Sequence, residues 1–163
     1  MLGIDPGTAT LGYGVIAVES GRLTFRACGA LNTPSTATAA ERLLQLYDGL
    51  QALMETHRPS EIAVEQLFFA KNHTTAMAVG QARGVVLLAA AKEGLLVGEY
   101  TPMQVKQAVA GQGRIDKRRV QQMVRMILGL TFDPQPDDAA DALAIAICHA
   151  NARAYDRRMA HAR

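Results

Sequence analysis

The chain has 163 residues, of which 49% are hydrophobic and 20% are charged, and its formal net charge at pH 7 is +2. These values predict a globular protein with a substantial buried core and exclude a disordered chain. No run of about 18 uncharged apolar residues is present, which argues against a membrane span, and residues 1–5 lack the basic and apolar regions of a signal peptide. We therefore expect a cytoplasmic protein in which residues 1–155 form a single domain and residues 156–163 a polar, frayed tail.

The chain is predicted to begin with three consecutive strands, over residues 2–4, 11–18 and 22–31. The turn signals Asp5-Pro6-Gly7-Thr8 and Ser20-Gly21 separate these strands. Because both connections are short, we expect an antiparallel meander.

The rest of the chain alternates between helical and extended patterns. Helices are predicted over residues 39–58, 75–93, 102–110, 117–128 and 138–154, and strands over residues 62–67 and 95–100. The middle of the last helix is apolar on every side, so we expect it to be buried. This order of elements predicts an α/β fold, with a mixed five-stranded sheet and helices on both of its faces.

Four carboxylates stand where a charge is unexpected. Asp5 follows an apolar strand, and Glu65 lies in a strand otherwise suited to burial. Asp138 and Asp141 share one face at the start of the last helix. Each has a simpler explanation on its own. Asp5 suits a turn and Glu65 suits an arginine partner, while Asp138 suits a helix N-cap and Asp141 the positive end of the helix dipole.

Together, these four carboxylates favour a metal site. Buried carboxylates without a partner cost several kcal/mol, and hard divalent cations are natural partners for clustered oxygen atoms. We predict that Asp5, Glu65, Asp138 and Asp141 are catalytic and hold two Mg²⁺ ions about 3.5–4 Å apart, a spacing used in phosphodiester cleavage. Mn²⁺ also suits oxygen ligands and is an alternative metal.

Basic residues are concentrated in the second half of the chain. Residues 101–130 contain six basic residues and one acidic residue, and residues 151–163 contain four and one. This asymmetry is typical of a surface that faces a polyanion, although a solvated helix face gives the same pattern. In the predicted loop after residue 67, an aromatic pair stands beside a cation, which suits stacking on unpaired bases, although the pair also suits a plug for the core. We expect DNA contacts from Phe68, Lys71, Lys106, Lys117, Arg118 and Arg119.

Several motifs occur in an order that resembles the RuvC family of bacterial Holliday junction resolvases. They are Gly3-Ile4-Asp5-Pro6-Gly7, Val64-Glu65-Gln66, Ala70-Lys71-Asn72, Gly80-Gln81-Ala82-Arg83-Gly84, Gln104-Val105-Lys106-Gln107 and Asp138-Ala139-Ala140-Asp141-Ala142-Leu143-Ala144. The resemblance covers about residues 1–155. It implies a ribonuclease H-like fold and Mg²⁺-dependent nicking of two strands of like polarity in a four-way DNA junction, leaving 5′-phosphate and 3′-hydroxyl ends, in recombination and DNA repair.

The resemblance also assigns roles to individual residues. The family's four acidic ligands correspond to Asp5, Glu65, Asp138 and Asp141; some relatives carry His at the third position, where this chain keeps Asp138. The basic junction-binding positions correspond to Lys106 and Lys117, and the aromatic contact corresponds to Phe68. The RuvA and RuvB branch-migration proteins are implied as partners.

The helix over residues 75–93 is implied as the interface of a homodimer. Its small residues permit another helix to approach closely, which is equally compatible with an internal core helix. The interface residues expected on this helix are Met77, Gly80, Gly84 and Leu88.

Three other functions fit parts of the sequence. One is a ribonuclease H-like nuclease that processes RNA, and another is a junction-binding module without nuclease activity. The third is an ATP-binding protein related to sugar kinases, suggested by Asp5-Pro6-Gly7-Thr8, but 163 residues are too few for the second lobe that this group requires.

Overall fold

The computed structural model describes residues 1–66 and 73–161. In this part of the chain, the strands form one sheet in the order β3-β2-β1-β4-β5. The strands are β1 (Leu2–Asp5), β2 (Thr10–Glu19), β3 (Arg22–Asn32), β4 (Glu61–Glu65) and β5 (Leu96–Tyr100). The helices are α1 (Ala39–His57), α2 (His73–Lys92), α3 (Pro102–Ala110), α4 (Lys117–Leu128) and α5 (Asp137–His161).

The sheet is mixed, as predicted. Short turns join β1 to β2 and β2 to β3, and both pairs are antiparallel. The pairs β1–β4 and β4–β5 are parallel. Parallel neighbours end at the same edge of a sheet, and the register pairs Ile4 with Val64. Asp5 and Glu65, the last residues of β1 and β4, therefore lie at one end of two adjacent strands.

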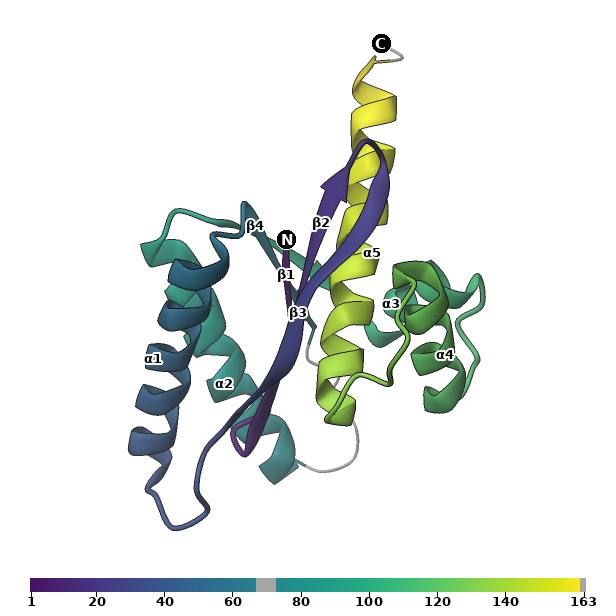
Figure 1. The fold of residues 1–163 in the computed structure, drawn as a ribbon. Helices are drawn as coiled ribbons and strands as arrows, with labels where there is room; N and C mark the ends of the chain where they lie inside the picture. The colour runs from purple at the N-terminus through teal and green to yellow at the C-terminus, as the bar shows by residue number, and fades with distance from the viewer. Residues whose placement is uncertain (67–72, 162–163) are drawn as a thin grey trace.

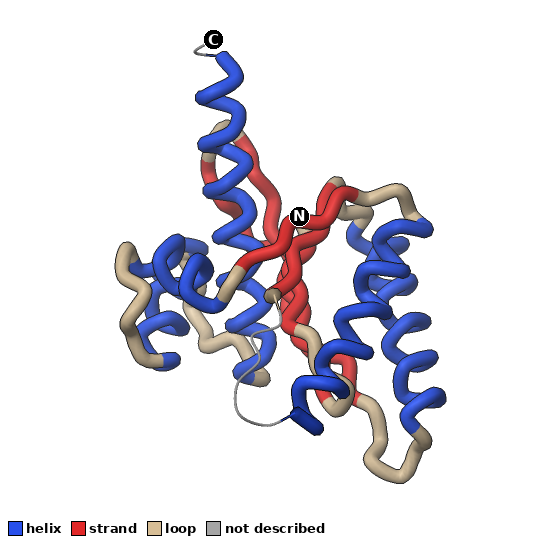
Figure 2. The backbone as a smooth tube through the Cα atoms, turned by 180° about the vertical axis from the view of Figure 1, so that it is seen from behind, coloured by secondary structure: helices blue, strands red, loops and turns tan. Residues whose placement is uncertain are grey.

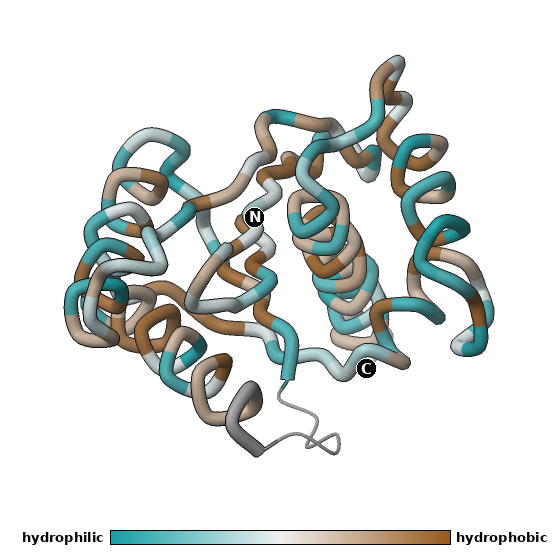
Figure 3. The backbone as a smooth tube through the Cα atoms, turned by 90° about the horizontal axis from the view of Figure 1, so that it is seen from below, coloured by the Kyte–Doolittle hydropathy of each residue, from teal (hydrophilic) through white to brown (hydrophobic). Residues whose placement is uncertain are grey.

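Helices cover both faces of the sheet, which confirms the predicted layers. Helices α1 and α2 lie on one face and α3, α4 and α5 on the other (Figure 1), and the view from behind agrees (Figure 2). An apolar layer fills each interface, with Leu50 and Val86 on the first face and Val124, Leu143 and Ile147 on the second. Seen from below, hydrophobic segments of the strands and of α5 lie in the middle of the molecule, with the other helices on either side (Figure 3).

Helix α5 lies directly on the sheet because glycines face it. A Cβ atom at Gly3 would overlap the carbonyl oxygen of Ala142, and one at Gly12 would overlap that of Asp138. A Cβ atom at Gly14 would come within 2.8 Å of α5. Glycine in a strand often marks such a close backbone approach. The position of the first turns of α5 is therefore set by contact with β1 and β2.

A buried histidine ties the middle of α5 to the sheet. His149 Nε2 lies 2.7 Å from Glu61 Oε2, and His149 Nδ1 lies 2.8 Å from the hydroxyl oxygen of Tyr100. Burial raises the pKa of Glu61, but hydrogen bonds from Arg153 and His149 outweigh it and lower the pKa overall. The ionised carboxylate only accepts, so Nε2 carries the proton, and Nδ1 of the neutral ring accepts from Tyr100.

The C-terminal part of the chain differs from the sequence expectation. Helix α5 runs to His161, so the predicted end of the last helix at residue 154 is wrong. No Gly or Pro interrupts residues 155–161, and Arg157 Nε donates to the carbonyl oxygen of Arg153 within the helix. The helix also begins at Asp137, which places Asp138 in its first turn. Although α5 is 25 residues long, neither it nor any other described helix has an apolar stretch sufficient to cross a membrane.

Candidate active site

A cavity of about 210 Å³ opens where β1 and β4 end. Three carboxylates and two amines line it, from Asp5, Glu65, Asp141, Lys106 and Lys117. The remaining lining residues are mostly apolar and come from α3, α4 and α5. Acidic residues from the beginning, middle and end of the chain thus meet in one place, as the unusual positions of these carboxylates predicted.

The strands position the first two carboxylates. Leu2 to Ile4 are fully buried, and Asp5 is the half-buried residue at which β1 emerges from the core. Glu65 ends β4 in the same way, after the buried residues Ile62 to Val64. Pro6 cannot donate a ladder hydrogen bond, so the sheet pairing of β1 stops at this point.

Helix α5 positions the other two carboxylates. Asp141 lines the cavity, whereas Asp138 lies one turn earlier, with its backbone packed over Gly12. Gly12 is the sheet partner of Asp5. Asp138 is not part of the cavity lining, but its charge contributes to raising the pKa values of both Asp5 and Asp141.

Clustering shifts the acid–base properties of the carboxyl groups. Burial raises the pKa of Asp5 to about 7, with further contributions from Glu65, Asp141 and Asp138, while Lys117 opposes the shift. Burial also raises the pKa of Glu65, helped by Asp141. The pKa of Asp141 is raised by burial even though Lys117 opposes this. The single positive charge of Lys117 does not stabilise all of these carboxylates in their ionised form, and a divalent cation would do so better.

Lys117 makes an ion pair that the sequence did not predict. Its Nζ lies 2.9 Å from Asp141 Oδ2 and 3.3 Å from Asp137 Oδ2. Burial lowers the pKa of Lys117, but the bonds to these carboxylates outweigh it and raise the pKa overall. Asp116, whose side chain accepts from the backbone N–H of Arg119, caps α4 and fixes where its first residue lies.

The donor set suits hard divalent cations, because all its anionic ligands are carboxylate oxygens. Within residues 1–66 and 73–161, however, no three acidic, histidine or cysteine side chains are arranged as a ready-made metal site. Asp141 is paired with Lys117 in this arrangement. The residues therefore fit a metal site in chemistry, and closing it around an ion requires side-chain movement.

The other expected DNA contacts fall into three groups. Phe68 and Lys71 lie outside the described residues. Arg118 and Arg119 are exposed on the first turn of α4, beside Lys117. Lys106 lines the cavity, where its charge opposes the raised pKa of Glu65. Basic side chains thus border the acidic cavity on the side of α3 and α4.

Three of the four expected interface residues, Met77, Gly84 and Leu88, are exposed on α2, and Gly80 is half-buried. The exposed fractions of Met77 and Leu88 are 69% and 56%. A Cβ atom at Gly84 would meet nothing within 4 Å, so the surface there is open. The interpretation of α2 as a wholly internal core helix does not hold within the described chain, because one of its faces is in solvent.

Comparison with known proteins gives matches over most of the chain. The family "Crossover junction endodeoxyribonuclease RuvC" matches residues 1–149. A protein of that name from Chloroflexus aurantiacus is 61% identical over 149 residues, which cover 91% of each chain. Another, from Heliobacterium modesticaldum, is 58% identical over 151 residues and 93% of each chain.

Solved structures match at the level of the whole fold. The structure of T. thermophilus RuvC in complex with Holliday junction substrate is similar with a TM-score of 0.86 and 43% identity, covering 91% of each chain. A second Thermus thermophilus RuvC structure has a TM-score of 0.84 and 41% identity, and covers 98% of this chain and 97% of that one.

Proposed function

The chain belongs to the RuvC family of crossover junction endodeoxyribonucleases, and we propose that it resolves four-way (Holliday) DNA junctions by nicking two strands of like polarity. Within the molecule, the observation that carries this proposal is the cavity that is lined by the carboxylates of Asp5, Glu65 and Asp141 and by two lysines. The family resemblance and the ribonuclease H-like α/β fold expected from the sequence are confirmed. The reaction serves recombination and DNA repair.

RuvC enzymes are metal-dependent nucleases, and we propose that Asp5, Glu65, Asp138 and Asp141 are the ligands of two Mg²⁺ ions. When bound, such ions supply an activated water and stabilise the leaving 3′ oxygen. The raised pKa of Asp5 supports this role, because the carboxyl must lose its proton to act as a ligand, and a divalent ion compensates for its burial. Mn²⁺ is an alternative metal.

The basic side chains around the cavity have a separate role, which is to bind the DNA. Lys117 neutralises the charge of Asp141, and a bound cation would free the Lys117 ammonium to contact a phosphate. Lys106 places a second positive charge beside Glu65. We assign phosphate contacts to Lys106, Lys117, Arg118 and Arg119, and, by resemblance, base stacking to Phe68 with Lys71 beside it.

The symmetry of the reaction supports a homodimer. A two-fold dimer presents two identical cavities, which matches two strands of like polarity in one junction. On α2, an exposed stripe contains Met77, Gln81, Gly84 and Leu88, and half-buried Gly80 lies beside it. We propose that this stripe is the dimer interface. We also propose a cytoplasmic protein that acts with the RuvA and RuvB branch-migration proteins.

A Leu88→Glu variant is expected to be a folded monomer that nicks junctions poorly, because a charge in an apolar two-fold interface meets its own copy. The matched control is Leu44→Glu on α1, since Leu44 has a similar exposed fraction, 59% against 56% for Leu88. Sedimentation velocity should give a dimer for the wild type and the control. A dimeric Leu88→Glu protein would place the interface elsewhere.

The function itself is tested on labelled substrates with Mg²⁺ or Mn²⁺. We expect paired, symmetric nicks in a four-way DNA junction and at most slow cleavage of linear duplex DNA. Preferred cleavage of an RNA–DNA hybrid would instead favour an RNA-processing nuclease. Junction binding without nicking in either metal would favour a binding module. Affinity should also fall steeply with salt, since each neutralised phosphate releases counterions.

A further inference from the structure

A second and larger cavity lies at the opposite end of the sheet from the acidic site. Its volume is about 580 Å³, and it forms where β1 and β4 begin, between the end of α1 and the second half of α5. Arg153 is twelve residues beyond Asp141 on α5, which corresponds to about 18 Å along the helix axis. The cavity is therefore separate from the proposed nuclease site.

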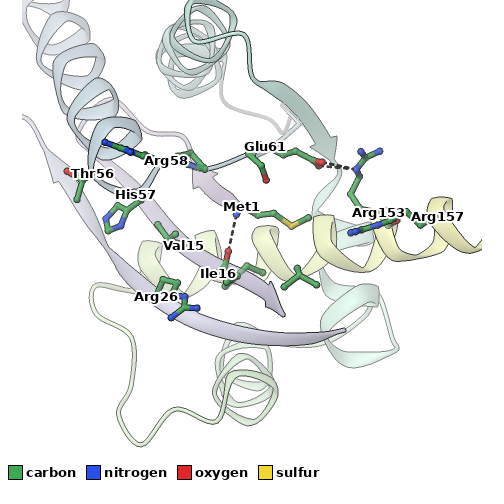
Figure 4. Close-up of a pocket in the computed structure, with 14 residues that line it drawn as sticks. Met1, Val15, Ile16, Arg26, Thr56, His57, Arg58, Glu61, Arg153 and Arg157 are labelled. Carbon is green, nitrogen blue, oxygen red and sulfur yellow. Dashed lines mark hydrogen bonds and ion pairs between the residues drawn. The ribbon is translucent and has the colours of Figure 1, made fainter. Parts of the chain in front are cut away.

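Basic side chains outnumber acidic ones in the lining of this cavity. Figure 4 shows that its basic side chains come from three directions: the end of α1, strand β3 and helix α5. They are Arg26, His57, Arg58, Arg153 and Arg157. Glu61 is the acidic lining residue in the described chain, and it already accepts hydrogen bonds from His149 and Arg153. Arg26 is paired with Glu19, and Arg153 is paired with Glu61.

Arg153 is oriented by the bond that it makes. Its Nε donates to Glu61, with distances of 3.2 Å to Oε1 and 3.0 Å to Oε2. Glu61 is in turn held by buried His149. A guanidinium has five N–H donors, so this contact leaves the terminal amino groups for another acceptor. A guanidinium held in this way is suited to paired hydrogen bonds with a phosphate.

Arg58 occupies a backbone position that favours glycine. It caps α1 with φ 42° and ψ 56°, in the left-handed region. The caps of α3 and α4, Gly111 and Gly129, have the same handedness and are glycines. A long cationic side chain at this position costs stability compared with glycine, and such costs often mark functional sites.

We propose that this cavity binds the phosphate groups of a small ligand of nucleotide size. Its volume is within the range of small-molecule sites, about 300–1,000 Å³. The arginines supply the charge-assisted donors, while Val15, Val18 and Pro59 supply an apolar wall for the rest of the ligand. A DNA backbone carries the same phosphate chemistry, but the acidic site at the other end of the sheet is where the DNA substrate would lie.

The test uses Arg58→Gly, because glycine suits the left-handed cap and the variant should melt at the same temperature as the wild type or higher. Calorimetry with pyrophosphate and with ATP, in EDTA and low salt, should show saturable binding to the wild type. Binding should weaken about ten- to a hundredfold in Arg58→Gly, the usual range for one charge-assisted contact. Arg22→Gln removes one exposed cation outside the cavity and should bind like the wild type.

Other outcomes overturn the proposal. The absence of saturable binding by either probe excludes a small phosphate ligand. If Arg58→Gly binds pyrophosphate and ATP like the wild type and an Arg118→Gln/Arg119→Gln variant does not, the phosphate groups bind at the first turn of α4 and not in this cavity. Weakened junction binding by Arg58→Gly, without pyrophosphate or ATP binding, makes the DNA backbone the occupant. Junction nicking by Arg58→Gly should equal that of the wild type, so failure of the nuclease assignment is detected separately.

Discussion

An Asp5→Asn variant is expected to bind four-way junctions and leave them uncut, with nicking reduced roughly a thousandfold or more, the scale of losing a central electrostatic group in an active site. Asn preserves the shape of the side chain and removes the charge that a divalent cation requires. Asp5 lies at the centre of the acidic cluster, where Glu65, Asp141 and Asp138 all influence its pKa. No other described carboxylate compensates for its loss, because each of these three is assigned its own ligand position.

The measurement is single-turnover nicking of a labelled junction, with binding followed separately by gel shift in Ca²⁺. Asp48→Asn is a matched control, since Asp48 is exposed on α1 and distant from the cavity. Nicking by Asp5→Asn at the wild-type rate would remove Asp5 from the mechanism and with it the proposed metal site.

The same substitution should stabilise the metal-free protein above neutral pH. The pKa of Asp5 is about 7 in the folded chain, compared with an ordinary value of 3.8. Because the folded chain binds the Asp5 proton more tightly than the unfolded chain does, the protonated carboxyl stabilises the fold. This stabilisation is complete below pH 4 and is lost as the pH rises through 7. That loss amounts to roughly 4 kcal/mol at most. Denaturant unfolding in EDTA at pH 5 and pH 8 should show a smaller decline for Asp5→Asn, and an equal decline would contradict the shift.

The position of the acidic site was predictable because local patterns determine it. Asp5 follows a short apolar strand, Glu65 ends a buried one, and a parallel pairing of the two strands joins their ends. The face shared by Asp138 and Asp141 follows from helical spacing alone. The parallel pairing itself is a long-range feature, and no local pattern in the sequence specifies it.

Contacts between distant helices were not predictable in the same way. The ion pair between Lys117 and Asp141 depends on how α4 packs against α5, which no local pattern specifies. The second cavity combines Arg58 with Arg153, which are brought together only by the complete fold. The glycines beneath α5 did leave a signal, because the i, i+2 spacing of Gly12 and Gly14 places both on one face of a strand.

A Gly3→Ala variant is expected to lose about 3 kcal/mol of stability, at the upper end of the usual cost of overpacking a core. The added Cβ atom would overlap the carbonyl oxygen of Ala142 and lie 2.7 Å from the backbone nitrogen of Ala146. Backbone atoms cannot move aside as a flexible side chain can, so α5 must shift away from β1. Asp141 is the residue before Ala142, and the shift therefore moves it away from Asp5.

This displacement should reduce nicking by more than the loss of stability explains, since a misplacement of about 1 Å can cost a hundredfold in rate. The control is Gly21→Ala at the β2–β3 turn, where φ is 81° and an added Cβ atom meets nothing within 4 Å. That variant should lose about 1 kcal/mol through its left-handed backbone and nick normally at a temperature where it is folded. Because both variants replace glycine with alanine, a nicking defect confined to Gly3→Ala at equal folded fraction would show that contact between α5 and the sheet sets the geometry of the acidic site. Normal nicking by folded Gly3→Ala would mean that the carboxylates tolerate the shift, and that metal binding rather than packing aligns them.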